Sequence, residues 1–264
     1  MIARSSFSLI IALLAVTSSS LSLAQTNPTS ITLCHENEDS YPWILKAKPG
    51  YSMILMKEIE SQLGLPIKLV ARPWKQCMDD VKSGAVDGAI NASYSKERAE
   101  FAAFPLKMDG EPDASKRMYR ATYALYRQKG GSIDFDGHKV NGATGSIGAQ
   151  TGFSIIAQLK QLGVKVDDSM TKADELLKQV ASGKLQGAAL QTTEADDALR
   201  DADLKAKVER VNTPLVEKPY YTVFNKAFEL KYRQSVREVW RLQGKVRDSA
   251  EFKGKVAHLV KAVD

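Results

Sequence analysis

The sequence predicts an α/β fold with two lobes, each a mostly parallel sheet flanked by helices, joined by a two-strand hinge. The first observation is an internal repeat, in which residues 81–90 (VKSGAVDGAI) match residues 180–189 (VASGKLQGAA). The second is the alternation of strand-like and helix-like segments around both copies, which is typical of parallel sheets covered by helices. A chain of 264 residues has room for one large domain or two small ones.

In the first half, apolar periodicity and capping residues predict each element in turn. Residues 31–34 form a first strand, and Ser52 can cap a helix that stops at Gly64. Residues 66–71 alternate as a second strand. A helix then follows Pro73 and ends at the Ser-Gly of the repeat, after which an apolar run predicts a buried strand.

The second half repeats this order. Ser154 can cap a helix that stops at Gly163. Residues 164–166 are predicted as an extended, strand-like segment, and residues 171–182 as the next helix. The second copy of the apolar run follows as a buried strand. Each half therefore supplies its own sheet and its own flanking helices.

Two extended segments, residues 118–126 and 219–224, are expected to cross between the lobes, and helices from Phe228 onward to return to the first lobe. Such a two-strand hinge suits closure around a ligand. The predicted boundaries are residues 25–118 and 224–264 for the first lobe and residues 119–223 for the second.

Residues 1–24 predict a cleaved signal peptide. Arg4 precedes an apolar run over residues 7–16, and Ser22-Leu23-Ala24 has the small residues that a signal peptidase reads, so cleavage is expected after Ala24. The alternative is an uncleaved anchor, but the run spans only about half of the ~30 Å hydrocarbon core. The product is expected to be soluble and exported, without stable membrane insertion.

Export also bears on the two cysteines, Cys34 and Cys77, which can pair in an oxidising compartment. Closing that loop would stabilise the fold by roughly 4 kcal/mol in the chain-entropy model. The alternative is two separate buried thiols. The 3 histidines are far apart and no C-x-x-C pattern exists, so no metal site is predicted.

The charge and the motifs exclude several classes of protein. A net charge of +6 is modest and scattered, and the basic segment around Arg237 is interpreted as a solvated helix face, so no nucleic-acid partner is expected. The sequence contains no G-x-S-x-G, no Walker loop and no G-x-G-x-x-G. Neither a catalytic constellation nor a cofactor is therefore predicted.

Arg98 is the leading candidate for ligand binding. It lies just past the first repeat's strand, and open α/β sheets place ligands at the carboxyl ends of strands. A guanidinium there can hold a carboxylate through two parallel hydrogen bonds. The alternative is a surface arginine paired with Glu97 or Glu100.

The segment from Gly152 through Phe153 to Ser154 opens a helix, whose free amides can attract an anion or serve only as a cap. Large rings that follow strands can form the walls of a site or belong to the core. Tyr41 and Trp74 are such residues.

Glu36 ends the first strand. It could meet a cationic group of a ligand. The alternative is a solvated acid beside Glu38 and Asp39.

Taken in order, several short segments resemble the bacterial extracellular solute-binding proteins of family 3, the polar amino-acid type of ABC-transporter receptor. The segments are Tyr41-Pro-Trp43, Gly50-Tyr51, Ser83-Gly-Ala-Val-Asp-Gly88, Lys96-Glu-Arg98, Gln150-Thr-Gly152 and Ser182-Gly-Lys-Leu-Gln186. Their order and spacing extend over nearly all of the expected mature chain. The resemblance implies a type II periplasmic-binding-protein clamshell that closes on a small solute.

By this resemblance Arg98 looks like the arginine that binds a ligand carboxylate, Trp74 like a stacking aromatic and Glu36 like an acid for the far end of the ligand. The full set of expected ligand-binding residues is Arg98, Glu36, Tyr41, Trp74, Ser93, Gly152, Phe153, Ser154 and Gln191. The family usually has an aspartate for the ligand ammonium where this chain has Gln191, and the loop before Arg98 is one residue shorter. Ligands with and without an α-ammonium both stay open.

The sequence thus predicts a periplasmic protein, monomeric as the family default, that captures a small carboxylate such as a polar amino acid and delivers it to an ABC permease. One alternative is a dehydratase-like enzyme on the same scaffold, for which Glu36 and Glu194 are the visible acid–base candidates. Another is a ligand-sensing partner of a membrane signalling protein.

Overall fold

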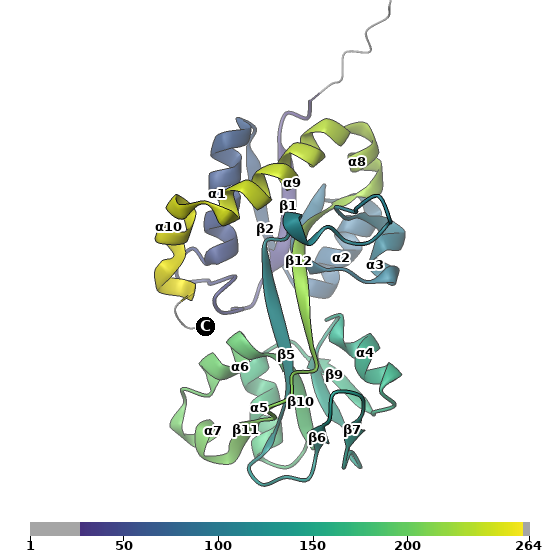
Figure 1. Ribbon diagram of the computed structural model, residues 1–264, viewed down its shortest axis with the longest axis vertical. Helices are drawn as coiled ribbons and strands as arrows, with labels where there is room; N and C mark the ends of the chain where they lie inside the picture. Colours follow the sequence, from purple (N-terminus) through teal and green to yellow (C-terminus); the bar gives the residue numbers. More distant parts are fainter. Residues whose placement is uncertain (1–26, 261–264) are drawn as a thin grey trace, which may run out of the picture.

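The structure is a computed structural model that describes residues 27–260, which form two lobes stacked along the long axis of the molecule (Figure 1). The signal peptide predicted over residues 1–24 lies outside the described residues. None of the described helices combines the length and the apolarity that crossing a membrane requires. The first lobe contains β1 (Ile31–Glu36), α1 (Tyr51–Leu63), β2 (Ile67–Arg72), α2 (Trp74–Ser83), β3 (Gly88–Ser93), α3 (Lys96–Phe101), β4 (Ala102–Ala103) and a 3-10 turn (Ala114–Lys116).

The chain then crosses to the second lobe along β5 (Tyr119–Gln128) and returns along β12 (Val216–Asn225). Between them lie β6 (Asp134–Phe135), β7 (Val140–Asn141), β8 (Ile147–Gln150), α4 (Ile155–Gln161), β9 (Val166–Met170), α5 (Ala173–Ala181), β10 (Gly187–Gln191), α6 (Thr192–Ala198), α7 (Ala202–Lys207) and β11 (Val208–Arg210). The closing helices are α8 (Lys226–Lys231), α9 (Arg233–Asp248) and α10 (Ala250–Val260), which lie on the first lobe (Figure 1).

One mixed sheet runs through both lobes in the order β2-β1-β3-β12-β5-β10-β8-β9. Its outer strands are parallel, β1 to β2 and β3 in the first lobe and β8 to β9 and β10 in the second. The crossing strands β5 and β12 are antiparallel, with Tyr119 opposite Tyr220 and Tyr123 opposite Val216. The predicted α/β fold is confirmed. The lobe boundaries at residues 118 and 223 stay a prediction, because β5 pairs with β10 of the second lobe, β12 pairs with β3 of the first, and the two crossing strands pair with each other.

Two predicted helix caps are wrong in their detail. Helix α1 begins two residues earlier than a Ser52 cap requires, with Gly50 as its N-cap, and Ser52 is buried with its hydroxyl 2.7 Å from Asn91 Oδ1. Ser154 is the N-cap of α4, but its side chain makes no capping hydrogen bond. Both hydroxyls instead make long-range contacts, which outweigh the local capping preference.

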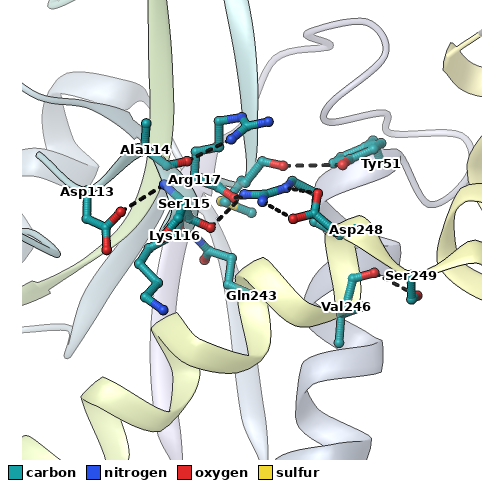
Figure 2. A network of polar contacts seen from close by, with 12 residues as sticks. Tyr51, Asp113, Ala114, Ser115, Lys116, Arg117, Gln243, Val246, Asp248 and Ser249 are labelled. Carbon is teal, nitrogen blue, oxygen red and sulfur yellow. Dashed lines mark hydrogen bonds and ion pairs between the residues drawn. The ribbon is translucent and has the colours of Figure 1, made fainter.

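The closing helix α9 is bound to the segment that leads into β5, and Figure 2 shows the polar network around Ser115, Arg117 and Asp248. Arg247 is buried and donates from Nη1 to the carbonyl oxygens of Ser115 at 3.1 Å and Arg117 at 2.5 Å. Its Nε and Nη2 donate to the Asp248 carboxylate at 2.8 and 2.5 Å. The chain returning from the second lobe is therefore fastened beside the start of the first crossing strand.

Replacing Gly244 of α9 with alanine is expected to destabilise the protein. A Cβ at Gly244 would lie 2.6 Å from the carbonyl oxygen of Ser115, so the helix would have to move away from that segment. We expect the free energy of unfolding, measured by chemical denaturation, to fall by about 1–3 kcal/mol. Gly254 in α10 is the matched control, because a Cβ there meets nothing within 4 Å. Gly254→Ala should raise the free energy of unfolding by up to about 1 kcal/mol. The prediction would be contradicted if both variants changed the free energy of unfolding in the same direction.

Candidate functional site

A cavity lies between the two lobes beside the crossing strands. The first lobe contributes the ends of β1 and β3 and the starts of α2 and α3, while the second contributes the start of α4 and the end of β10. Predicted site residues that line the cavity are Glu36, Trp74, Ser93, Arg98, Phe153, Ser154 and Gln191. The parallel strands of both lobes thus direct their carboxyl ends to one place.

Arg98 is buried and makes all its side-chain hydrogen bonds to neutral oxygen atoms. Nη1 donates to the carbonyl oxygen and the hydroxyl of Ser93 at 2.9 and 3.1 Å, and Nη2 donates to the carbonyl oxygen of Gly152 at 3.0 Å. The guanidinium carbon lies 5.4 Å from the ring centre of Trp74. Burial lowers the pKa of Arg98, because desolvation disfavours the charged form. The alternative interpretation, a surface arginine paired with Glu97 or Glu100, is therefore wrong: Arg98 is buried and bonded to Ser93 and Gly152.

Lys218 of β12 is a second cation at the site, and no sequence pattern predicted it. Its Nζ donates to the carbonyl oxygen and hydroxyl of Ser154 at 3.3 and 3.1 Å, and lies 5.8 Å from the ring centre of Tyr123. The Ser154 hydroxyl is in turn 2.8 Å from the Ser93 hydroxyl. Burial, and then the nearby charge of Arg98, lower the pKa of Lys218 to about 8.

Three tyrosines of the crossing strands, Tyr119, Tyr123 and Tyr220, line the cavity and were likewise not predicted. The hydroxyls of Tyr123 and Tyr220 are 2.9 Å apart, and Gln191 Nε2 donates to both, at 3.4 and 3.3 Å. Burial raises the pKa of Tyr220 to about 12, so this hydroxyl stays neutral. Trp43 stacks on Tyr119 with ring centres 3.6 Å apart, which places Trp43 in the core.

Two buried carboxyl groups complete the site. Glu36, expected in one interpretation to be solvated, is 8% exposed and accepts hydrogen bonds from the amides of Asn37 at 2.8 Å and Glu38 at 3.2 Å. Burial raises its pKa. Glu194 lies behind the wall, where it accepts from the Ser40 hydroxyl and from Gln150 Nε2. The Ser40 contact joins the first lobe to the second.

Tyr41 and the amides around Gly152 are placed differently from expectation. Tyr41 is absent from the cavity wall, because its hydroxyl donates to the carbonyl oxygen of Leu259 at 3.3 Å and its ring faces Arg200. Ser40, the preceding residue, lines the cavity in its place. The Phe153 amide is not free, since it donates to the Gln150 carbonyl oxygen at 3.0 Å. Gly152 contributes through its carbonyl oxygen, which holds Arg98.

The buried Glu194 carboxyl is expected to make stability depend on pH. Burial raises its pKa from 4.5 to about 7, so between these values the folded state holds a proton that the unfolded state releases. Stability conferred by that proton is lost as pH rises through this window, by up to about 3 kcal/mol. Glutamine does not titrate, so the Glu194→Gln variant should not lose this stability. In denaturant unfolding, its free energy of unfolding relative to the wild type should therefore increase by about 3 kcal/mol as pH rises from 4.5 to 7.

The exposed Glu97→Gln variant is the matched control for loss of one negative charge. A wild-type to Glu194→Gln difference that stays constant from pH 4.5 to pH 8 would contradict the prediction. The gain should level off above pH 7, because both states of the wild type are then ionised.

Comparison with known proteins matches residues 37–114 to the family described as "Bacterial extracellular solute-binding proteins, family 3". No curated protein sequence matches the chain significantly. Within residues 27–260, no group of three or more histidine, cysteine or acidic side chains is arranged to hold a metal ion.

Solved structures with the same fold include two amino-acid-binding proteins and one sensor domain. ArtJ, the arginine-, lysine-, histidine-binding protein of Geobacillus stearothermophilus, superposes with a TM-score of 0.69 at 16% identity over 88% of this chain and 95% of its own. The amino acid ABC transporter substrate-binding protein AbpA of Streptococcus pneumoniae, bound to L-arginine, gives 0.68 at 19% identity over 89% and 95%. A histidine kinase sensor domain with similarity to periplasmic binding proteins gives 0.70 at 14% identity over 88% and 96%.

The sequence identities to these structures are too low to identify the ligand of this protein, but all three structures share its fold. The predicted resemblance is confirmed. The chain carries the sequence pattern of the bacterial extracellular solute-binding proteins of family 3 over residues 37–114, within the two-lobe fold of the type II periplasmic binding proteins.

Proposed function

We propose that this protein is a periplasmic solute-binding protein that captures a small carboxylate, a polar amino acid or an analogue, and delivers it to an ABC transporter. The observation that carries the proposal is Arg98, a cation that is 7% exposed in the interlobe cavity and donates only to neutral oxygens. A buried charge without a counter-charge is unfavourable. A ligand carboxylate would supply that counter-charge through paired hydrogen bonds.

The proposed binding residues come from both lobes, which explains how a solute would drive closure. Arg98, Trp74 and Ser93 belong to the first lobe, and Phe153 and Ser154 to the second. Only a closed molecule offers both sets to one ligand, so ligand binding favours the closed state by its differential affinity. Gln191 would meet the group beside that carboxylate, and Glu36 the polar group at the far end of the solute.

The test is thermal stability of the purified protein, unfolded and refolded to remove any retained solute, against a panel of amino acids and ammonium-free carboxylates. A solute at one hundred times its Kd should add about 2.7 kcal/mol of stability. Stabilisation by a carboxylate but not by its methyl ester supports the proposal, and mass spectrometry of the recovered solute, unchanged, separates capture from turnover. Absence of stabilisation across the whole panel would overturn it.

A second candidate is a receptor that reports solute occupancy to a membrane sensor, and the likeness in fold to a histidine kinase sensor domain favours it. Capture would be the same in both cases, and only the partner would differ. Crosslinking of the solute-loaded protein in envelope preparations, with identification of the partner as a permease or a signalling protein, distinguishes the two. Size-exclusion chromatography tests the accompanying expectation of a monomer.

A further inference from the structure

Two cations, rather than one, lie at the same end of the site, Arg98 in the cavity wall and Lys218 behind Ser154, which lines the cavity. Arg98 donates to the Ser93 hydroxyl at 3.1 Å, and Lys218 donates to the Ser154 hydroxyl at 3.1 Å. These hydroxyls are themselves 2.8 Å apart, so a pair of serines stands between the guanidinium and the ammonium. Lys218 lies directly behind Ser154 and over the ring of Tyr123, both of which line the cavity.

Within residues 27–260, neither cation is neutralised by a carboxylate. The hydrogen bonds of Lys218 go to the two oxygens of Ser154, and those of Arg98 go to Ser93 and Gly152. The nearby acid of the wall, Glu36, is already engaged by two backbone amides. Burial, and then the nearby charge of Arg98, lower the pKa of Lys218, as expected for two like charges in a site with little water. An anion that satisfied both would relieve this repulsion.

We propose that Lys218 is a specificity-determining residue that selects a solute with two carboxylates, one held by Arg98 and the second by Lys218 across the Ser93–Ser154 pair. This inference rests on the proposed function and names its substrate class. A dicarboxylate fits better than a single carboxylate, because the two serine hydroxyls separate the cations and the planar fork of Arg98 can hold a whole carboxylate by itself. The cavity would therefore prefer an acidic amino acid, or the corresponding ammonium-free diacid, over its amide.

The experiment is calorimetric titration at pH 7 with four matched solutes, L-glutamate, L-glutamine, glutarate and glutaramate. The first and third carry two carboxylates, whereas the second and fourth carry one carboxylate and one amide. The first two also carry an α-ammonium that the last two lack. The shorter pair L-aspartate and L-asparagine tests chain length. Each solute is titrated into the wild type, Lys218→Met, Lys218→Arg and, as a matched control, Lys165→Met at an exposed lysine of the second lobe.

We expect the wild type to bind dicarboxylates more tightly than their amides, and Lys218→Met to weaken dicarboxylate binding by roughly tenfold to a hundredfold. Amide binding should change little, which a merely structural role of Lys218 would not allow. Lys218→Arg should restore the preference, and Lys165→Met should leave it unchanged. The thermal midpoint of each solute-free variant shows whether it is folded.

Two outcomes would overturn the inference while leaving solute binding in place. One is an amide that binds as tightly as its diacid in the wild type, and the other is a folded Lys218→Met variant that keeps the wild-type preference. Failure of the proposed function would give a different result. In that case none of the solutes would bind to the wild type or to its variants in calorimetry, and no solute of the wider panel would stabilise the wild type.

Discussion

Arg98→Ala is expected to weaken carboxylate binding by about 2–5 kcal/mol, which is roughly thirtyfold to several thousandfold in Kd. The guanidinium is buried at the interlobe cavity and stands over Trp74, so water cannot replace it as a partner for a bound anion. Its contact with the Gly152 carbonyl oxygen also joins the two lobes, and the variant loses that contact as well. Calorimetric titration with the best solute of the panel measures the loss.

Two further variants separate charge, geometry and general effects of removing an arginine. Arg98→Lys keeps the positive charge but loses the planar fork, and we expect it to recover only part of the affinity. Arg120→Ala removes an arginine of β5 that is half exposed and paired with Glu217 at 2.6 Å, and it should bind like the wild type. Unchanged affinity in Arg98→Ala, in a protein that melts as the wild type does, would remove Arg98 from the site.

Much of the site was predictable because it depends on short-range rules. Ser93 ends a strand and Arg98 follows it, Trp74 begins a helix, and Gln191 ends a strand of the second repeat. In a parallel sheet the carboxyl ends of strands lie at one edge, so residues at those ends are brought together whatever the details of packing. The repeat within the chain showed that this would happen twice, from opposite sides of one cavity.

The crossing strands carried the residues that were not predicted. Tyr119, Tyr123 and Tyr220 reach the cavity, and Lys218 lies behind its wall, because β5 and β12 pair antiparallel, with Tyr119 opposite Tyr220. That register joins segments distant in sequence, and no local pattern fixes it. Alternation along the predicted strand does place Tyr119 and Tyr123 on one face, and this signal could have marked them. For Lys218 the sequence offers only a lysine before a proline.

Some residues lie in the predicted segments but make other contacts than expected, because residues distant in sequence bind them. Tyr41 follows the first strand as predicted, yet Ser40 faces the cavity because its hydroxyl donates to Glu194 of the opposite lobe. Ser154 was expected as a cap and Gly152 as a source of free amides. Instead Ser154 binds Ser93 and Lys218, and Gly152 offers its carbonyl oxygen to Arg98. Contacts between the lobes therefore decide which atoms a loop presents.

Loss of the bond between Cys34 and Cys77 is expected to lower the free energy of unfolding by about 4 kcal/mol, a fall of roughly 10 °C in Tm. The two residues are bonded as the sequence predicted, across a separation of 43 positions. Both are fully buried, so the reduced protein has to be prepared by refolding in reductant. Cys34→Ala/Cys77→Ala is the control, because its stability should not respond to reductant. Equal unfolding free energies for the oxidised and the reduced wild type would contradict the prediction.

The same bond should also affect the cavity, but less than Arg98 does. Cys34 lies on β1 just before Glu36, and Cys77 lies in the first turns of α2 after Trp74. The bond therefore fixes the helix that carries Trp74 against the strand that carries Glu36. Without it the buried side chains of α2 still pack on the sheet, so the ring of Trp74 gains freedom without leaving Arg98. We expect the refolded reduced protein to bind its solute less than tenfold more weakly. A larger loss, measured below the lowered Tm, would mean that the bond positions the binding site as well as stabilising the lobe.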